Sequence, residues 1–419
     1  MAARIETRVL VVGAGPAGLL AALQLVREGI AVEIIDEQWR PAGHSYALGL
    51  HPSSLALLER FGLADEIVES GSRVPRMSIF EGREERAAAP LGGGSFPFVL
   101  SLPQSTLERV LENRLAERGV HVKWSHRLAA IGPSEHGMTA RVERLAKESG
   151  GYAVAHTTWV IDKFLEFRSE FVIGADGHHS MVRRRLDLPF EETSPSQVFA
   201  VFECEVGRSI PSELRLVLAG STVNAMWPLP DGRARWSLEI DAAEVRAADR
   251  YKSRLTTQIG ERFFHHLDEA ELRAILSDRA PWFEPVFAGL GWSIEVRFER
   301  RMAGSLGRDR TWLAGDAAHL TGPVGMQSMN AGLQEAAAVA ETMGRILRGE
   351  VSISALRELE RRTLAEWAFL HGRAGRLKPT SSAPPLVASC VDRLLPCLPG
   401  TGEEIDAIAR SLGLTVERV

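Results

Sequence analysis

The residue types best suited to chemistry near the start of the chain are three glycines and an aspartate. Gly13, Gly15 and Gly18 form the pattern G-x-G-x-x-G, and Asp36 follows them at about the 20-residue spacing seen in dinucleotide-binding folds. Such glycines allow a tight turn, the close approach of backbone to a pyrophosphate and the packing of a helix on a strand, while the carboxylate binds a ribose hydroxyl. With 38 glycines in 419 residues, chance alone supplies the bare pattern roughly 0.3 times, so its context decides.

The elements around these glycines are the ones that a dinucleotide site needs. Residues 8–12 form a short apolar run typical of a buried parallel strand, and residues 19–27 read as a helix. A second apolar strand over residues 31–35 ends at Asp36. The predicted helix N-terminus would offer free N–H groups and about half a positive charge to the phosphates. The sequence therefore predicts a dinucleotide-binding unit at its start.

Two later segments also place a carboxylate just after an apolar strand. The first, Glu-Phe-Val-Ile-Gly-Ala-Asp-Gly over residues 170–177, carries Asp176 and is followed by Ser180 and Arg183. The second, Thr-Trp-Leu-Ala-Gly-Asp-Ala-Ala-His over residues 311–319, carries Asp316. It continues through Pro323, Gly325, Gln327 and Asn330 into an apolar-rich helical pattern over residues 331–347, whose N-terminus could face an anionic or electron-rich ligand.

Taken together, the three motifs resemble those of the flavoprotein monooxygenases of the para-hydroxybenzoate hydroxylase type, the single-component aromatic hydroxylases. The resemblance covers about residues 5–350, with GAGPAG at 13–18, GADG-x-x-S-x-V-R at 174–183, and GDAAH at 315–319 followed by P-x-G-x-Q-x-x-N. It implies an α/β fold in which a Rossmann-like FAD-binding domain of the GR2 type carries an inserted β-sheet substrate domain and a helical C-terminal region.

For the site, the resemblance implies an FAD cofactor held by residues from all three motifs. The FAD pyrophosphate would lie at Gly13, Gly15, Ala17 and Gly18, the adenosine ribose at Asp36 with its neighbour Glu37, and the ribityl chain or its phosphate at Asp316. Backbone N–H groups after Gly325, near Met329 and Asn330, would face the flavin pyrimidine ring; Gln104 would contact the ribityl chain, and Leu128 would lie in a strand over the adenine. In the family, the Asp176–Gly177 turn and Arg183 are associated with both FAD and nicotinamide use.

The sequence departs from the family pattern at two places and names no catalytic residue. Met326 and Ser328 replace two glycines of the usual segment beside the flavin ring. His44 and the residues after it stand where many relatives carry an arginine, so His44 is either a substitute contact or an exposed loop residue. The three tyrosines, at positions 46, 152 and 251, fall outside the predicted pocket strands, and no metal site is expected.

Because the motifs must converge on one ligand, the FAD-binding domain is expected to be discontinuous. We expect it to comprise residues 1–75, 103–185 and 290–350, with residues 76–102 and 186–289 forming the substrate domain and residues 351–419 a C-terminal helical region. The Pro-Asp-Gly at 230–232, between two alternating runs, predicts a β-hairpin in the substrate domain. Phe199, Phe202 and Trp227 are candidates for its pocket, with ordinary core packing as the alternative.

The family resemblance implies a monooxygenase that uses NADPH or NADH and dioxygen to hydroxylate or epoxidise an aromatic or polyketide-like small molecule through a flavin C4a-hydroperoxide. Only one G-x-G-x-x-G pattern is present, so the nicotinamide is expected to act as a transient reductant without a second dinucleotide domain. A flavin-dependent halogenase or reductase on the same fold, and an FAD-binding protein without turnover, are the alternatives.

Composition limits the other classes of function. A net charge of -5 gives no basic field for nucleic acid, and no apolar run reaches the roughly 20 residues of a membrane span. Three cysteines without paired or metal-ligand spacing fit a reducing cytoplasm. The expected partner is therefore a small-molecule substrate in the cytoplasm, and a homodimer is left open.

Overall fold

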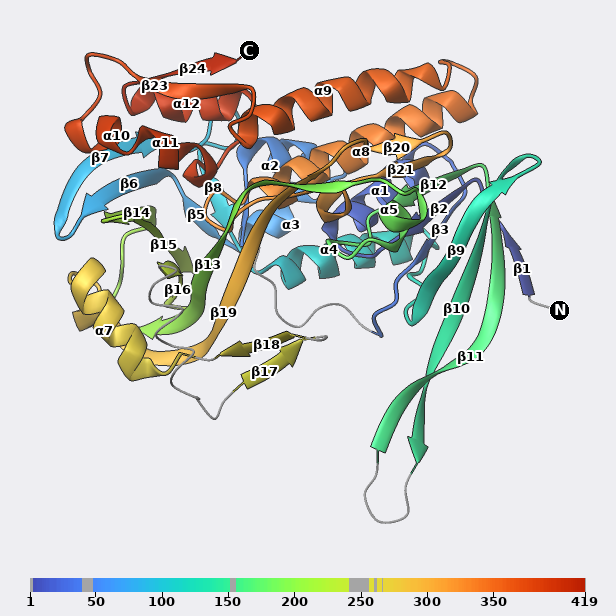
Figure 1. Ribbon diagram of the computed structural model, residues 1–419, viewed down its shortest axis with the longest axis horizontal. Helices are drawn as coiled ribbons and strands as arrows, with labels where there is room; N and C mark the ends of the chain where they lie inside the picture. The colour runs from blue at the N-terminus through green and yellow to red at the C-terminus, as the bar shows by residue number, and fades with distance from the viewer. Residues whose placement is uncertain are drawn as a thin grey trace.

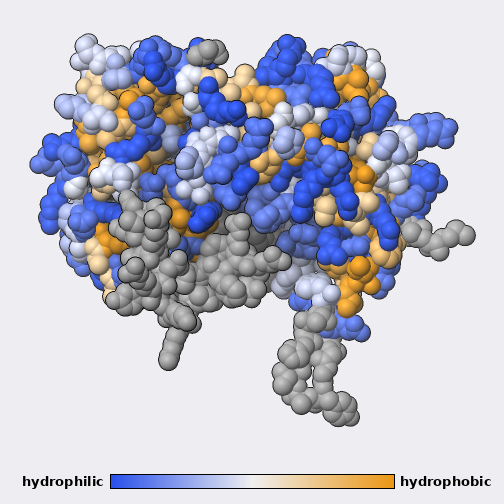
Figure 2. All heavy atoms as spheres, in the orientation of Figure 1, coloured by the Kyte–Doolittle hydropathy of each residue, from blue (hydrophilic) through white to orange (hydrophobic). Residues whose placement is uncertain are grey.

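The computed structural model describes residues 3–39, 48–150, 156–240, 256–259, 262–265 and 267–418. Two large β-structures dominate it, joined by helices that run along one side (Figure 1). On the face shown in Figure 2, hydrophilic residues are spread widely and hydrophobic residues gather in smaller groups between them. Within the described residues, no helix is both long and apolar enough to cross a membrane.

The first structure is a five-stranded sheet in which the three motifs meet. Its strand order is β20-β21-β12-β2-β3, and β21, β12, β2 and β3 run parallel. The strand bounds are β2 Val9–Val12, β3 Val32–Ile35, β12 Phe171–Gly174, β20 Gly307–Arg308 and β21 Thr311–Leu313. Because Gly174 pairs with both Val12 and Leu313, the three motif turns leave neighbouring strands at one edge of the sheet. The expected strand–turn–helix–strand unit is confirmed.

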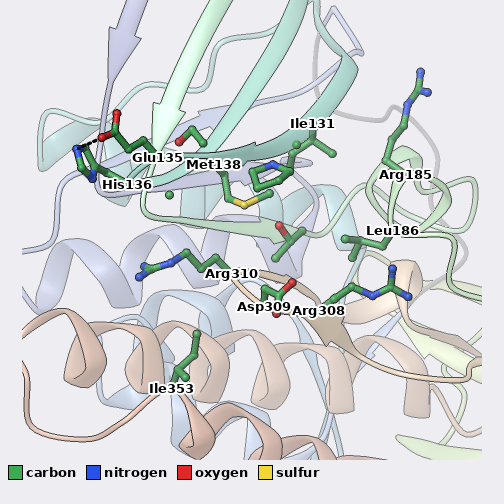
Figure 3. A pocket seen from close by; sticks show the side chains of 15 residues that line it. Ile131, Glu135, His136, Met138, Arg185, Leu186, Arg308, Asp309, Arg310 and Ile353 are labelled. Carbon is green, nitrogen blue, oxygen red and sulfur yellow. Dashed lines mark ion pairs between the residues drawn. The ribbon is translucent and has the colours of Figure 1, made fainter.

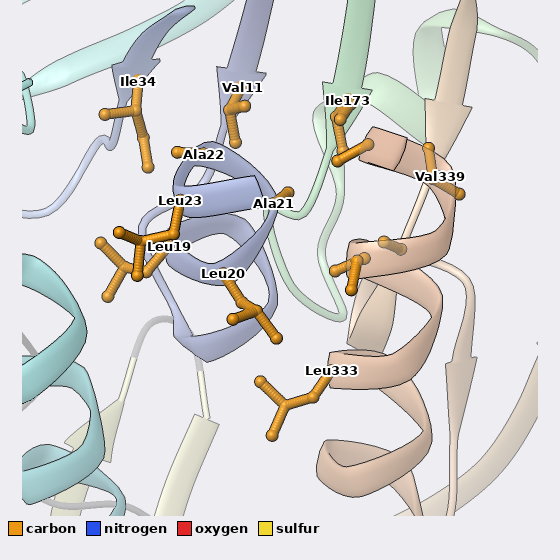
Figure 4. Packing of buried hydrophobic residues seen from close by; sticks show 14 of the residues in the cluster. Val11, Leu19, Leu20, Ala21, Ala22, Leu23, Ile34, Ile173, Leu333 and Val339 are labelled. Atoms are coloured by element: carbon orange, nitrogen blue, oxygen red, sulfur yellow. The ribbon is translucent and has the colours of Figure 1, made fainter. Parts of the chain in front are cut away.

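A layer of helices buries one face of this sheet. Helix α1 (Pro16–Arg27) lies between α4 (Gln104–Glu117) and α8 (Gln327–Leu347), and Figure 4 shows its side chains between those of the strands and of α8. Leu20 and Leu333 are completely buried in this layer. Because α1 is enclosed by sheet and helices, its sequence is apolar nearly all round. Two shorter helices follow in the chain, α2 Pro52–Glu59 and α3 Ala64–Glu69. The strands β4 Gly49–Leu50, β8 Val99–Ser101 and β5 Ser72–Val74 form a small sheet of order β4-β8-β5.

A four-stranded sheet of order β1-β11-β10-β9 lies beside the parallel sheet. Its strands are β1 Ala3–Glu6, β9 His126–Ser134, β10 Gly137–Gly150 and β11 His156–Ser169, and α5 (Met181–Arg185) follows β12. The β10–β11 hairpin projects from the body of the molecule (Figure 1).

The second large structure is an eight-stranded sheet of order β22-β19-β13-β16-β15-β14-β6-β7. Its strands are β6 Arg76–Glu81, β7 Glu84–Pro90, β13 Phe190–Val206, β14 Glu213–Ala219, β15 Thr222–Leu229, β16 Arg233–Ile240, β19 Phe287–Ala303 and β22 His319–Leu320. The predicted hairpin is β15–β16, turning through Asp231 and Gly232, both with positive φ. The pair β17 Thr256–Ile259 and β18 Arg262–His265 lies nearby, and α7 (Glu269–Arg279) and η1 (Glu284–Val286) precede β19.

Strand β19 crosses the boundary that we expected between residues 289 and 290. It pairs with β13 from Phe287 opposite Val206 to Ala303 opposite Phe190. This long pairing holds residues 290–303 in the large sheet, although the next strand pair, β20–β21, belongs to the nucleotide sheet. Sequence motifs alone could not place the boundary, because it depends on how far two distant strands pair.

The C-terminal region is a mixed structure packed on the large sheet. It contains α9 Ser354–Leu370, β23 Gly375–Pro379, α10 Pro385–Ser389, α11 Val391–Leu394, η3 Leu395–Cys397, α12 Glu403–Ser411 and β24 Leu414–Arg418. Helices α9 and α12 agree with the helical region expected over residues 351–419, whereas the antiparallel β23–β24 pair was not foreseen. Leu377 and Leu414 from this pair are buried against the large sheet's core, which explains why so short a pair is stable.

Candidate functional site

Close backbone contacts explain two glycines at the edge where the three motifs meet. Gly13 has φ +105°, and a Cβ atom there would lie 2.1 Å from the Ala175 carbonyl oxygen. A Cβ on Gly18 would lie 2.0 Å from the carbonyl oxygen of Gly13. Neither position can accept a side chain, so these glycines bring strand β2, helix α1 and the second motif into direct contact.

Gly15 differs because the space beside it is open. No heavy atom that the structure describes lies within 4 Å of a Cβ built on this residue. Gly15 is the N-cap of α1, where no side chain caps the helix and the first turn has no acidic residue. The free N–H groups and the positive end of the helix dipole thus face an open surface, which suits an anionic group.

Asp36 lies beside this turn, and backbone groups already orient its carboxylate. Oδ2 accepts a hydrogen bond from the Ala14 N–H at 2.7 Å, and Oδ1 accepts one from the Gln38 N–H at 2.7 Å. Burial raises the pKa of Asp36, although both N–H donors act in the opposite direction. Its neighbour Glu37 is exposed. The carboxylate that the motif predicted for a ribose is therefore held next to the glycine turn.

Helix α4 and strand β9 approach the same place from another side. The Gln104 side-chain amide donates to Glu108 Oε1 at 2.7 Å. Burial raises the pKa of Glu108 to about 7, and the negative charge of Asp36 adds to the effect. Leu128 is buried in the domain core, two residues beyond His126, whose N–H donates to the Asp36 carbonyl oxygen at 2.7 Å. Sequence reasoning missed Glu108; its position one turn after Gln104 was the available signal.

Asp176 and Arg183 of the second motif have different structural roles. The Asp176 carboxylate accepts hydrogen bonds from the Ser180 hydroxyl at 2.5 Å and the Met181 N–H at 2.7 Å, so it caps α5. Arg183 donates to the carbonyl oxygen of Ala317 at 2.7 Å, and its guanidinium lies 3.7 Å from the centre of the Phe190 ring. Asp176 therefore stabilises the second motif itself, and Arg183 joins this motif to the third.

Asp316 is the exposed carboxylate of the third motif. The Ser328 hydroxyl donates to Asp316 Oδ1 at 2.7 Å. On the same turn, Ala17 packs against Gly315, where an added Cβ would lie 3.0 Å from the Ala17 Cβ. Ser328, which stands where relatives have glycine, thus orients a residue expected to hold the cofactor.

The start of α8 is anchored by buried contacts. Asn330 donates to the carbonyl oxygens of Gly49 and Met326, each at 2.9 Å, and its Oδ1 accepts from the His51 N–H at 2.8 Å. Met326 has φ +52° at the helix N-cap, and its side chain packs against Gly49. The Asn330 side chain already makes these three hydrogen bonds, so its role is to order this segment. Only the backbone groups of the segment could therefore face a flavin.

The neighbours of Asn330 connect the helix start to other regions. The Gly325 N–H donates to the Pro396 carbonyl oxygen at 3.2 Å, which ties this turn to the C-terminal region. Met329 is half-buried and packs on the core of the nucleotide domain. His319, at the end of the third motif, is completely buried; it hydrogen-bonds Glu335 at 2.6 Å and stacks on Trp367 at 3.7 Å. His319 therefore orders the turn.

A cavity of about 280 Å³ lies between the large sheet, the segment before α8 and the C-terminal region. Its walls come from six segments of the chain: Ser194, Pro195, Gln197 and Phe199 of β13; Ser221 and Val223 at the start of β15; Glu239 of β16; Arg300 of β19; Gly322, Pro323 and Val324; and Asp392, Arg393, Pro396 and Cys397. Of the three pocket candidates, Phe199 lines this cavity. Phe202 lies in the core on the sheet's other face, with α7, and Trp227 is core and not part of the wall.

A second hollow has a volume of about 730 Å³, and Figure 3 shows the side chains that line it. It is formed by the β9–β10 turn, the end of α5, the β20–β21 turn and Ile353 before α9. Thr311, the first residue of β21, lines it, so it opens at the amino end of that strand. The motif turns lie at the carboxyl end, where parallel sheets bind ligands. This hollow is therefore not the cofactor site.

The residues at the motif edge fit FAD. An uncapped helix N-terminus, an open surface at Gly15 and the carboxylates of Asp36 and Asp316 match the pyrophosphate, ribose and ribityl parts of this cofactor. His44 and the three tyrosines lie outside the described residues, so no contact is assigned to them.

Comparison with known proteins supports this fit. A family model described as an FAD binding domain matches residues 6–368. The 6-methylpretetramide 4-monooxygenase of Streptomyces rimosus is 29% identical over 349 residues, which are 82% of this chain and 56% of that protein. The rifampicin monooxygenase of Rhodococcus hoagii is 28% identical over 401 residues, covering 92% of this chain and 74% of that protein. The chain thus spans little more than half the length of the first of these relatives.

The fold has a counterpart among solved structures. The crystal structure of p-nitrophenol 4-monooxygenase from Pseudomonas putida DLL-E4 superposes with a TM-score of 0.69 at 20% identity, covering 98% of this chain and 94% of that one. At this identity the likeness shows the fold alone. The resemblance inferred from the three motifs is confirmed by the family model, which covers most of the chain. The chain therefore belongs to the FAD-binding domain family.

Proposed function

We propose that the protein is a cytoplasmic FAD-dependent monooxygenase that uses NADH or NADPH and dioxygen to hydroxylate or epoxidise an aromatic or polyketide-like small molecule. One observation carries the proposal. The segment Gly322–Val324 lines the cavity on one side and leads directly into Gly325 and the start of α8, where the flavin ring is expected. A small molecule in the cavity would therefore lie next to the cofactor.

The chain's own residues would hold FAD through backbone groups and two carboxylates. The N–H groups at the start of α1 would bind the pyrophosphate, Asp36 the adenosine ribose and Asp316 the ribityl chain. The chemistry that bound FAD supplies is acceptance of a hydride from the nicotinamide and activation of dioxygen. The N-terminus of α8 carries a partial positive charge, which would stabilise negative charge on the flavin pyrimidine ring.

The cavity walls would orient the substrate and exclude water from it. Phe199 offers an aromatic face, and its ring meets that of Phe298 edge to face at 5.7 Å. The Gln197 amide donates to Glu239 Oε1 at 2.6 Å, and the Val223 N–H donates to Glu239 Oε2 at 2.8 Å. Because its carboxylate is held by these donors, Glu239 shapes the wall, and we assign no catalytic base.

Two alternatives are a flavin-dependent halogenase or reductase on this fold and an FAD-binding protein without turnover. The second alternative gained support from Met326 and Ser328, which replace glycines. In the structure, Met326 turns its side chain onto Gly49, and Ser328 turns its hydroxyl onto Asp316. Neither side chain lines the cavity, so neither replacement narrows the space for a substrate there.

Oxygen uptake by the FAD-loaded protein tests the proposal. We expect NADH or NADPH oxidation and oxygen consumption to rise at least about tenfold when an accepted phenolic or polyketide substrate is added. The same protein stripped of FAD is the control, and mass spectrometry should detect a product heavier by one oxygen atom. If a broad panel of phenols and polyketides gives no oxygen uptake above the FAD-free control, the proposal fails; a halide-dependent product would support the halogenase.

A further inference from the structure

A completely buried histidine lies beside the segment expected to face the flavin ring. His51 is the N-cap of α2, and its side chain has no exposed surface. Its Nε2 atom lies 2.9 Å from the Gly325 carbonyl oxygen, and its backbone N–H donates to Asn330 in the first turn of α8. His51 therefore contacts both ends of the segment 325–330, although it belongs to none of the three motifs.

The hydrogen bond to Gly325 fixes the tautomer of the imidazole ring. A carbonyl oxygen can only accept, so Nε2 carries the proton and donates it. Burial lowers the pKa of His51, so the ring is neutral at neutral pH and Nδ1 carries no proton. Nδ1 has no hydrogen-bond partner among the described residues. Glu404 of α12, 3.9 Å from Nδ1, is held instead by the N–H groups of Ser53 and Thr401. The ring is therefore a single donor aimed at Gly325.

This hydrogen bond sets the direction of the next backbone N–H group. The peptide bond between Gly325 and Met326 is trans, and in a trans peptide the C=O and N–H groups point to opposite sides. Because the Gly325 carbonyl points at His51, the Met326 N–H points away from it. No acceptor among the described residues pairs with this N–H. The group is therefore available to a ligand.

Met326 has a strained backbone at this point. Its φ of +52° lies in the left-handed region, which costs a residue other than glycine about 1–3 kcal/mol and persists only where the surroundings hold it. His51 holds the carbonyl side of Gly325, and the Pro396 carbonyl oxygen of η3 holds the other side by accepting from the Gly325 N–H at 3.2 Å. Both peptide groups that meet at Gly325 are thus fixed before the chain reaches Met326.

We propose that His51 is a positioning residue for the flavin: its hydrogen bond to the Gly325 carbonyl oxygen holds Met326 in the left-handed conformation and keeps the Met326 N–H directed at the pyrimidine ring. This inference rests on the proposed function, in which the N-terminus of α8 faces that ring. A fixed N–H group stabilises the negative charge that reduction places on the ring, so it favours reduced over oxidised FAD. His51 therefore raises the reduction potential of the bound cofactor without touching it.

A matched pair of amide variants tests this role. Glutamine carries its amide donor near the position of the histidine Nε2 atom, whereas the donor of asparagine is one methylene short of it. His51→Gln should bind oxidised FAD within about twofold of the wild type and keep its reduction potential. His51→Asn should bind oxidised FAD about threefold and reduced FAD about thirtyfold more weakly. This tenfold difference lowers the two-electron reduction potential by about 30 mV.

Fluorescence titration with FAD and anaerobic equilibration with a redox dye measure these two quantities. Gln334→Leu is the control for damage to packing. The Gln334 amide also joins α8 to α2, by donating to the Ser53 carbonyl oxygen at 2.9 Å, but it makes no bond to the segment 325–328. This variant should lower the melting temperature and leave the reduction potential unchanged. A merely structural role of His51 would give the same result in His51→Asn.

A double variant tests the part played by strain at Met326. Glycine adopts the left-handed conformation without strain, so adding Met326→Gly to His51→Asn should restore at least about half of the lost reduction potential. If the double variant recovers none of it, His51 does not act through the conformation of Met326, and the inference is overturned.

The inference is also overturned if His51→Asn keeps the wild-type reduction potential, if His51→Gln shifts the potential as much as His51→Asn, or if Gln334→Leu shifts it equally. These measurements need neither substrate nor dioxygen. If the potential depends on His51 but no substrate stimulates oxygen uptake, the positioning role stands and the monooxygenase proposal fails. If oxygen uptake occurs while the potential is independent of His51, the opposite conclusion follows.

Discussion

The cofactor edge and the cavity lie close together but are built in different ways. At the edge, contiguous motifs bring backbone against backbone, as where Gly13 and Gly18 approach carbonyl oxygens. The cavity is built from side chains that come from β13, the large sheet, the Gly322–Val324 segment and the C-terminal region. Backbone contacts at van der Waals distance tolerate almost no change, whereas side-chain walls can change without altering the fold. We therefore expect the first region to hold the cofactor and the second to vary with the substrate.

Gly13→Ala should have the largest effect on stability, because the added methyl group would clash with the backbone at the cofactor edge. The new Cβ would lie 2.1 Å from the Ala175 carbonyl oxygen at φ +105°. We expect the free energy of unfolding to fall by at least about 4 kcal/mol, or the protein to be insoluble. Urea denaturation followed by circular dichroism measures this. If the variant is as stable as the wild type, the backbone at the cofactor edge can move to accept a side chain. The edge would then tolerate change as well as the cavity wall does.

The buried carboxyl of Glu108 should make the edge sensitive to pH. Burial raises its pKa from 4.5 to about 7, so the native state holds the proton more tightly than the unfolded chain. The raised pKa of Glu108 therefore stabilises the folded protein fully below pH 4.5. As pH rises from 4.5 to about 7, this contribution is lost, and the free energy of unfolding falls by about 3 kcal/mol. Glu108→Gln should remove this pH dependence while keeping a partner for Gln104.

Denaturation of the wild type and of Glu108→Gln, at about pH 4.5 and about pH 8, isolates this contribution from all other titrating groups. The wild type should lose more stability than the variant over this range. Parallel curves for the two proteins would contradict the assignment of a raised pKa to Glu108.

Gly15→Ala separates cofactor binding from folding at the same edge. No described atom lies near the added Cβ, so the melting temperature without FAD should match that of the wild type. The methyl group would occupy the surface where the pyrophosphate approaches, and the dissociation constant of FAD should rise at least about tenfold. Fluorescence titration with FAD measures it. An unchanged FAD affinity would place the cofactor elsewhere.

Ser328→Gly should have a smaller effect, because it removes one hydrogen bond to the exposed Asp316. We expect FAD to bind about two- to fivefold more weakly, which corresponds to the loss of one modest hydrogen bond. Ser328→Thr keeps the hydroxyl and is the matched control. If glycine binds FAD as well as serine does, the hydroxyl does not orient Asp316 for the cofactor.

Arg300→Gln should have the smallest effect on stability and so completes the contrast. The substitution loses only the hydrogen bond from Arg300 to the Leu370 carbonyl oxygen, while it removes a half-buried positive charge whose Nε has no hydrogen-bond partner. In the ligand-free protein the free energy of unfolding should change by no more than about 0.5 kcal/mol, or rise. A loss comparable to that of Gly13→Ala would mean that the cavity wall supports the fold as strongly as the cofactor edge does.

The sequence predicted the cofactor edge well because each part of it is local. A strand, a glycine turn and a helix follow one another within residues 8–27, and the register of β2, β12 and β21 brings the three motifs together. The cavity was harder to foresee. Phe199 was named as a wall residue, but Phe202, three residues further along the same strand, faces the opposite core. Their assignment depends on sheet packing, which a single sequence does not show.

By itself the sequence determined the family and the FAD cofactor and predicted which residues surround the pyrophosphate, because these depend on short motifs whose chemistry is carried by neighbouring backbone groups. Only the tertiary structure revealed that Arg183 holds the third motif, that Asn330 is used in buried contacts, and that Arg300 and Arg393 meet in one cavity. These contacts join residues far apart in the chain. The pairing of β13 with β19 and the packing of the C-terminal region decide the cavity in particular, and both depend on the whole folded chain.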